Sequence, residues 1–209
     1  MNRSRLEAFS DGVFAVAITF LVFNLAVPRR GGPPVLDQLT ADWPKFVAYL
    51  ISFLTIGIIW VNHHALVQNI AVVDRTLLFL NLLLLAFVAT IPFSTATMAE
   101  FLTSPGRDAT VATAIYALDF EFIALCFTAL FEWTLRNEDR MHHPVPVAAR
   151  PAARLRFYAG LLPYAAAVGI AFASPAASVV ITGLVAVYYV FERTTAARHD
   201  QGAGAGPQP

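Results

Sequence analysis

The class of fold is decided by residues 5–12, which read Arg-Leu-Glu-Ala-Phe-Ser-Asp-Gly, and by the apolar run from 13 to 27 that follows them. Only Thr19 and Asn24 interrupt the run, which is long enough to cross a bilayer. In a soluble protein Ser10 and Asp11 would be ordinary helix caps. In a membrane segment Asp11 needs a partner, because a lone charge in hydrocarbon is costly. Arg5 is the nearest candidate, on the same helix or for a neighbouring helix.

The composition of the whole chain is that of a membrane protein with several spans. Its 209 residues are 57% hydrophobic and 13% charged, with a mean hydropathy of +0.62, whereas soluble domains carry about 25% charged residues. The net charge is zero, which gives no basic surface for nucleic acid. The single cysteine, Cys126, excludes an internal disulfide and a cysteine metal cluster, and we expect it to be a small buried side chain. We expect no cleavable signal peptide.

Apolar stretches separated by loop signals predict an all-α fold with six transmembrane helices. The stretches are 9–27, 42–61 with Asn62-His63-His64 at its end, 76–98 with a kink at Pro92, 109–135, and 157–191, which Ser174-Pro175 divide into a hairpin. A glycine- and proline-rich loop at 28–34 and a polar connection at 136–156 separate them. The sequence thus predicts a transmembrane channel domain over residues 1–193 and a disordered cytoplasmic tail over 194–209.

The distribution of positive charge predicts cytoplasmic termini. With the N-terminus inside, ten arginines lie on the inner side: Arg3, Arg5, Arg75, Arg136, Arg140, Arg150, Arg154, Arg156, Arg193 and Arg198. Four basic residues lie outside: Arg29, Arg30, Lys45 and Arg107. The positive-inside rule therefore favours this orientation.

Three stretches of the first hundred residues resemble the transmembrane protein 175 family of potassium channels, in its bacterial branch. They are Arg5-x-x-x-Phe9-Ser10-Asp11-Gly12 with the Val-Phe-Ala-Val-Ala-Ile-Thr that follows, Trp60-Val-Asn-His63-His64, and Ile91-Pro-Phe-Ser-Thr95. The second half matches this branch only in hydropathy. The motif occurs once, so a pore built from it needs several subunits, and the resemblance implies a homotetramer in the bacterial inner membrane.

The resemblance also implies that the first helices line a central pore for potassium, weakly selective over sodium. By motif offset, the apolar and threonine rings fall on Val16, Thr19 and Phe23, with Phe20 as the alternative register. Helical spacing alone puts these residues on one face, which could equally be a packing or lipid-facing stripe with Thr19 bonded to its own helix. The family usually has an aliphatic residue at the position of Phe23. The chain lacks the Thr-Val-Gly-Tyr-Gly filter of conventional potassium channels.

The remaining polar residues have several interpretations. Arg5, Ser10 and Asp11 could clamp the inner end of the first helix, with Trp60 and His63 in the same network, although a histidine near a helix end is often a packing residue. A His63-His64 metal pair is weakly supported, because adjacent helical residues diverge and no third ligand is evident.

Carboxylates in the fourth segment support an alternative function, a proton-conducting channel or cation transporter. Asp119, Glu121 and Glu132 lie within or at the edges of this segment, so they belong either to a path through the subunit or to the membrane interfaces. Asn24 could face the outer pore mouth or be ordinary polar packing. We expect no catalytic residue, no metal and no cofactor other than permeant potassium, since the sequence has no nucleophile elbow, zinc motif or phosphate loop.

Overall fold

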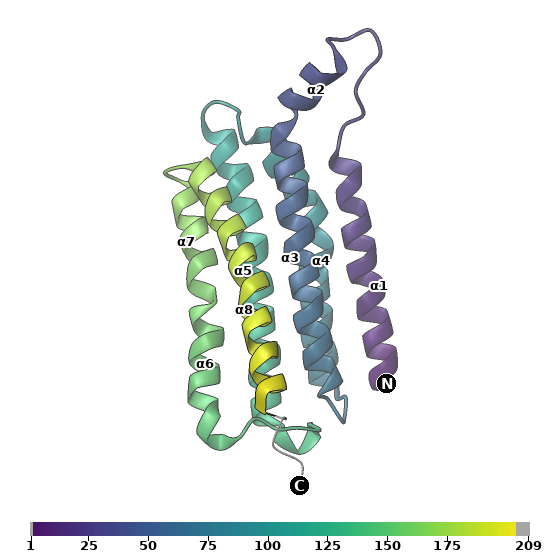
Figure 1. Cartoon of the computed structure of the whole chain (residues 1–209), viewed down its shortest axis with the longest axis vertical. Coiled ribbons are helices and arrows are strands. Elements are labelled where there is room, and N and C mark those ends of the chain that lie inside the picture. Colours follow the sequence, from purple (N-terminus) through teal and green to yellow (C-terminus); the bar gives the residue numbers. More distant parts are fainter. Residues whose placement is uncertain (1, 204–209) are drawn as a thin grey trace.

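The computed structural model is a bundle of long helices that run along one axis (Figure 1). It describes the backbone of residues 2–203 and the side chains of residues 2–189. The helices are α1 (Arg3–Leu21), α2 (Val35–Ala41), α3 (Trp43–Gln68), α4 (Arg75–Phe101), α5 (Arg107–Arg136), α6 (Arg150–Ala159), α7 (Leu161–Ala171) and α8 (Pro175–Ala203). Short 3₁₀ turns lie at η1 (Val22–Asn24), η2 (Glu138–Arg140) and η3 (Val147–Ala149). Within residues 2–203 the extended pairing is limited to one isolated bridge, between Ile70 and Met141, so the predicted all-α class is confirmed.

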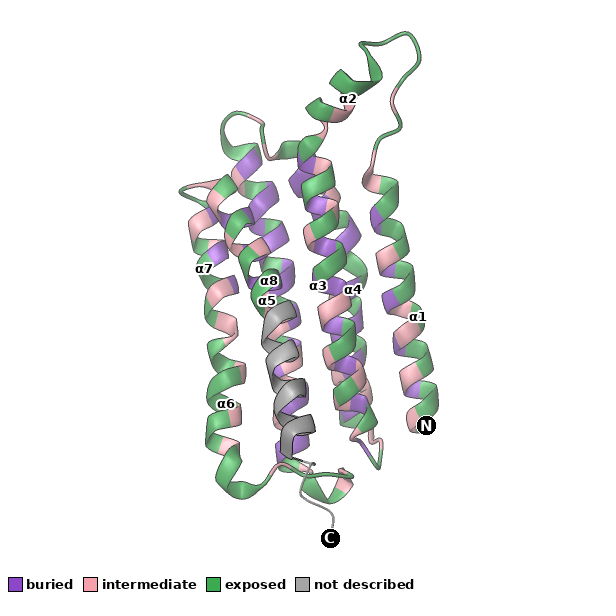
Figure 2. Cartoon of the chain, in the orientation of Figure 1, coloured by how far each residue is buried: buried purple, intermediate pink, exposed green. Residues whose placement is uncertain are grey.

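The bundle has a centre and two sides. Helix α4 packs against α1, α3 and α5, while α5 packs against α4, α7 and α8. Helix α1 lies at one edge and contacts α3 and α4, whereas α6 and α7 lie at the opposite edge and α8 lies between α7 and α3 (Figure 1). The buried residues lie on the faces that the helices turn toward one another, and α1 keeps a broad exposed face (Figure 2). An exposed apolar face on a peripheral helix has to be covered by lipid or by another subunit.

Four helices of the described chain are long and apolar enough to cross a membrane on their own. These spans are Arg3–Asn24, Trp43–Gln68, Arg75–Phe101 and Arg107–Arg136. The remaining length divides into α6 and α7, which meet at Gly160, and into α8, whose described apolar part is Pro175–Tyr189. The chain is therefore a multi-pass membrane protein, and the count of six spans stays a prediction.

The first helix begins earlier and ends earlier than the sequence suggests. It starts at Arg3, where the Asn2 side chain accepts a hydrogen bond of 3.1 Å from the backbone nitrogen of Arg5. Ser10 and Asp11 lie inside the helix, so neither residue caps its N-terminus. The α-helix ends at Leu21 and not at residue 27, because the chain tightens into η1 before it leaves the bundle.

Other boundaries also differ from the prediction. Helix α3 continues past His63 and His64 to Gln68, and α2 follows directly on the glycine- and proline-rich loop. Helix α6 begins at Arg150, within the segment predicted as a polar connection, since Pro151 suits a first helical turn. Helix α4 continues through Pro92. The predicted tail at 194–209 remains a prediction, because residues 204–209 lie outside the described residues and no side chain beyond 189 is described.

Candidate functional site

The exposed face of α1 and η1 carries the four residues assigned to a pore. Val16 is 52% exposed, Phe20 53% and Phe23 76%, and Thr19 is exposed as well. Three bulky apolar side chains on one helical stripe would normally be buried, and here the rest of the subunit does not cover them. The structure thus brings these four residues together on a surface that is available to other copies of the chain.

The Thr19 hydroxyl is oriented by its own helix. It donates a hydrogen bond of 2.7 Å to the carbonyl oxygen of Ala15, one turn earlier. A hydroxyl that donates its hydrogen backward keeps its lone pairs available on the side away from the helix. A cation is bound by lone pairs, so this bond leaves the Thr19 oxygen suited to replace part of an ion's hydration shell.

Phe23 differs from Val16 and Thr19 in its backbone. It lies in the 3₁₀ turn η1, where successive residues are spaced at three per turn, so the α-helical offset does not fix its direction. Its ring lies 6.2 Å from the ring of Phe20, tilted by 59°. The two phenylalanines form one aromatic patch, and the single chain supports either register.

The inward face of α1 is held by a chain of buried hydrogen bonds. The Asn81 amide of α4 donates to the Ser10 hydroxyl at 3.1 Å, and the Asn81 carbonyl oxygen lies 2.6 Å from Nε2 of His63 on α3. Ser10 in turn donates to the carbonyl oxygen of Leu6 at 2.9 Å. The Phe14 ring packs against the His63 ring at 5.4 Å. We call Ser10, His63 and Asn81, which are all buried, the inner hydrogen-bond chain.

A second, more exposed contact ties α1 to α3 beside this chain. The Trp60 indole donates a hydrogen bond of 2.8 Å to the Asp11 carboxylate and stacks on His64 at 5.7 Å. Glu7 lies 3.1 Å from Nδ1 of His64, without hydrogen-bond geometry. Asp11 therefore has an uncharged partner within the subunit.

The predicted pairing of Arg5 with Asp11 does not occur within the described part of one chain. Arg5 is exposed, as are Phe9 and Gly12, and no ion pair joins Arg5 to a carboxylate of the residues described. A side chain added at Gly12 would meet no atom within 4 Å. These three residues continue the exposed stripe of Val16 and Thr19 at helical spacings of three and four. They thus lie where a neighbouring subunit would contact them.

The predicted intramembrane carboxylates do not form one path. Asp119 on α5 is buried and accepts hydrogen bonds from Thr90 at 2.8 Å and from Ser94 at 2.7 Å, both on α4. Glu121 lies two residues on, so it points to a different side of α5, and its buried Oε2 atom has no hydrogen-bond partner in the described chain. Glu132 lies near the C-terminal end of α5 and pairs with Arg154 at 2.7 Å.

Asn24 and the two histidines also differ from the expected sites. The Asn24 amide donates to the carbonyl oxygen of Pro92 at 2.9 Å, which directs it toward α4 and not along the exposed stripe. His63 is buried against Asn81, whereas His64 turns toward Trp60, so the two rings cannot share a metal ion. Among the described residues there is no group of three His, Cys, Asp or Glu side chains that could hold one.

Sequence reasoning missed Asn81, Thr90 and Ser94. Asn81 interrupts an otherwise apolar run between Leu77 and Leu85, and a lone amide in a membrane segment indicates a buried hydrogen bond. That signal could have identified Asn81. Thr90 and Ser94 carry no such signal, because hydroxyls commonly bond to their own helix.

Comparison with known proteins finds similarity to potassium channels in both sequence and structure. A family model described as endosomal/lysosomal potassium channel TMEM175 matches residues 5–92. A potassium channel of Streptomyces collinus is 47% identical over 196 residues, which cover 92% of this chain and 94% of that protein. The crystal structure of a lysosomal potassium-selective channel TMEM175 homolog from Chamaesiphon minutus is 34% identical, covers 91% of this chain and 97% of that chain, and has a TM-score of 0.81.

A more distant relative carries a different description. The endosomal/lysosomal proton channel TMEM175 of Homo sapiens is 32% identical over 143 residues, which cover 62% of this chain and 28% of that protein. The similarity to the bacterial proteins extends into the second half of the chain, beyond the hundred residues that carry the motifs.

Proposed function

This chain belongs to the TMEM175 family, and from that premise we propose that it forms a potassium channel of a bacterial inner membrane. The family is one of ion channels, which favours passive conduction over catalysis, and we propose no enzymatic activity and no cofactor. The permeant ion would be potassium, with modest preference over sodium.

The observation that carries this proposal is the division of α1 into two faces. Its inward face is fixed by the inner hydrogen-bond chain, and its outward face leaves Val16, Thr19 and Phe23 uncovered. In a homotetramer with α1 at its centre, each uncovered residue becomes a ring around the axis. A ring of hydroxyls from Thr19 would partly replace the hydration shell of potassium, and the apolar rings would close the path by excluding water.

The polar contacts on the inward face give α1 a fixed orientation in this assembly. A pore-lining helix must present the same stripe in every subunit, and a rotation of one residue turns it by about 100°. The hydrogen bonds of Ser10 and Asp11 to Asn81 and Trp60 oppose such a rotation. We propose that Arg5 acts between subunits, because it lies on the exposed stripe.

For the membrane topology we propose six crossings, with α6–α7 as the fifth and α8 as the sixth. These helices run the length of the bundle beside α3 and α5, and the two ends of the described chain lie at the same end of it (Figure 1). An even number of crossings places both ends of a chain on the same side of the membrane. The arginine-rich end is then cytoplasmic, including both termini.

The test is a reversal-potential measurement on the purified protein in liposomes. With potassium on one side and sodium on the other, a potassium-preferring channel gives a reversal potential displaced toward the potassium equilibrium value. Linear, non-saturating current in symmetric potassium would separate a channel from a transporter. A reversal potential near zero under a potassium–sodium gradient would contradict potassium preference.

A second candidate function is proton conduction, favoured by the buried Asp119 and by the similarity to the human proton channel. Asp119 already accepts two hydroxyl hydrogen bonds, which suits a structural carboxylate better than an open relay. Proton flux should be measured under a pH gradient in potassium-free liposomes. Loss of that flux in Asp119→Asn, with potassium current kept, would support this candidate. The matched control is Glu100→Gln, an exposed carboxylate on α4.

A further inference from the structure

A cavity of about 480 Å³ lies on the side of the bundle away from α1, between α3, α5, α6 and α8. Its volume is within the range of roughly 300–1,000 Å³ that ligand pockets in proteins occupy. The neighbouring loop with Met141 and Val145 contributes to its lining at one end. Since α1 contributes no lining residue, the cavity is separate from the proposed conduction path.

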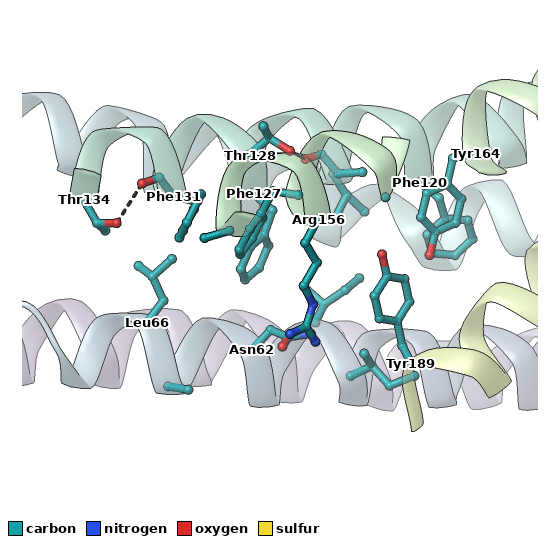
Figure 3. Close-up of a pocket in the computed structure, with 18 of the residues that line it drawn as sticks. Asn62, Leu66, Phe120, Phe127, Thr128, Phe131, Thr134, Arg156, Tyr164 and Tyr189 are labelled. Atoms are coloured by element: carbon teal, nitrogen blue, oxygen red, sulfur yellow. Dashed lines mark hydrogen bonds between the residues drawn. The ribbon is translucent and has the colours of Figure 1, made fainter. Parts of the chain in front are cut away.

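The walls of the cavity divide into apolar and polar parts (Figure 3). Phe120, Phe127 and Phe131 line it from α5, and Leu66 lines it from α3. Three polar side chains project into the middle of the cavity from three different helices (Figure 3). They are Arg156 on α6, Asn62 on α3 and Tyr189 on α8.

The junction of α6 and α7 shapes this polar part. A side-chain carbon added at Gly160 would lie 2.7 Å from the Tyr189 hydroxyl, so only a glycine allows the hydroxyl to approach the backbone there. Beyond Tyr189, the cavity continues to Phe120 near the middle of α5 and to Tyr164 in the first turn of α7 (Figure 3). The polar part therefore has an apolar extension toward the centre of the membrane.

The charge of the cavity is set by Arg156. Arg156 is the one charged residue among the side chains that line the cavity. A guanidinium fits a phosphate or carboxylate through two parallel hydrogen bonds. An anion in the cavity could therefore form hydrogen bonds with the Arg156 guanidinium.

We propose that this cavity binds an anionic phospholipid of the leaflet at the arginine-rich end of the bundle. Its phosphate would contact Arg156, with Asn62 and Tyr189 as neutral hydrogen-bond donors, and one acyl chain would extend between the phenylalanines toward Phe120. A soluble anion would fill only the polar part and would leave the aromatic walls in contact with water. A zwitterionic lipid would bring a cation beside Arg156 and would bind less well.

The experiment measures lipid retained by the purified full-length protein in detergent, by native mass spectrometry and by the shift of its thermal unfolding midpoint. The probes are dioleoylphosphatidylglycerol, dioleoylphosphatidylcholine with the same chains, and oleate. We expect phosphatidylglycerol to be retained and to raise the midpoint more than phosphatidylcholine does. Arg156→Gln should weaken its retention by about tenfold, the effect of losing one charge-assisted hydrogen bond.

Matched variants separate the cavity from the general surface. Ala124→Phe fills the cavity from α5 and should remove retention, whereas Ala86→Phe, at an exposed position of α4, should not. Arg136→Gln removes an equal charge from an exposed side chain at the same end and should leave retention unchanged. Equal retention of the two phospholipids, or an unaffected Arg156→Gln variant, would overturn the proposal. Retention of oleate but not of phosphatidylglycerol would also overturn it, in favour of a free fatty acid.

Discussion

At the scale of single residues, we propose that the Thr19 hydroxyl gives the exposed stripe its preference for potassium. Its hydroxyl hydrogen is engaged with Ala15, and its lone pairs are directed away from the helix. We predict that Thr19→Val lowers the potassium-to-sodium permeability ratio several-fold with little effect on assembly, because it replaces the hydroxyl by a methyl group of similar size. Thr19→Ser should keep most of the preference. Reversal potentials of the three proteins check this.

We propose that Phe23 sets the width of one part of the pore. It is more exposed than Val16 and Phe20, and a ring of four phenylalanines would narrow the lumen and repel water. Phe23→Ala should therefore increase single-channel conductance several-fold. If Phe23→Ala leaves the current unchanged and Thr19→Val leaves the reversal potential unmoved, this register of α1 does not line the pore. The same recordings on Phe20→Ala would then test the alternative register.

At the scale of elements, the contact of α1 with α3 and α4 depends on the inner hydrogen-bond chain. Asn81 bridges His63 and Ser10, and all three are buried. Asn81→Ala would leave a buried histidine nitrogen without its partner, and each such loss costs about 1–3 kcal/mol. We predict a lower thermal unfolding midpoint in detergent.

The control for Asn81→Ala is Thr97→Ala. Thr97 lies on the same helix, and within the described residues its hydroxyl bonds to the Phe93 carbonyl oxygen of that helix. Its removal leaves no interhelical partner unsatisfied, so the midpoint should stay close to that of the parent. An Asn81→Ala midpoint equal to the control would show that the chain of hydrogen bonds does not stabilise the packing of α1.

At the scale of the whole molecule, assembly depends on the exposed faces that a single subunit cannot cover. Arg5 lies on the exposed stripe, and Asp11 is held by Trp60 at the side of it. We predict that Arg5→Ala and Asp11→Ala each reduce the yield of assembled protein more than they change selectivity. Asp11→Ala leaves the Trp60 indole without its acceptor, and Arg5→Ala removes the side chain that we propose contacts a neighbouring subunit. Size-exclusion chromatography gives the assembled fraction. Normal assembly with loss of potassium preference would assign these residues to ion selection instead.

The membrane topology is a second property of the whole molecule. With six crossings, a reporter inserted within residues 137–149 should report the cytoplasm, and one within residues 30–40 should report the exterior. The arginines near the first site and the positive-inside rule are the reason. Alkaline phosphatase and fluorescent-protein fusions distinguish the two sides. A periplasmic signal from 137–149 would contradict the orientation.

The sequence by itself determined the class of the fold and the family. Hydropathy and helix signals act over short distances along the chain, so four long apolar helices could be predicted to within a few residues at most ends. The stripe of Val16, Thr19 and Phe23 followed from the same local periodicity. The early end of α1 and the start of α6 were missed, because capping and 3₁₀ tightening depend on the local hydrogen bonds that form.

Only the tertiary structure decided which polar groups meet. Asp11 was expected to pair with Arg5, and it binds Trp60, because α3 brings an indole donor within 2.8 Å while Arg5 turns to the outside. Asn81 binds both His63 and Ser10, and Ser10 lies 71 residues before it in the chain. The cavity around Arg156 is built by helices from both halves of the sequence. Contacts between distant segments depend on how helices pack and rotate, and no local pattern contains that information.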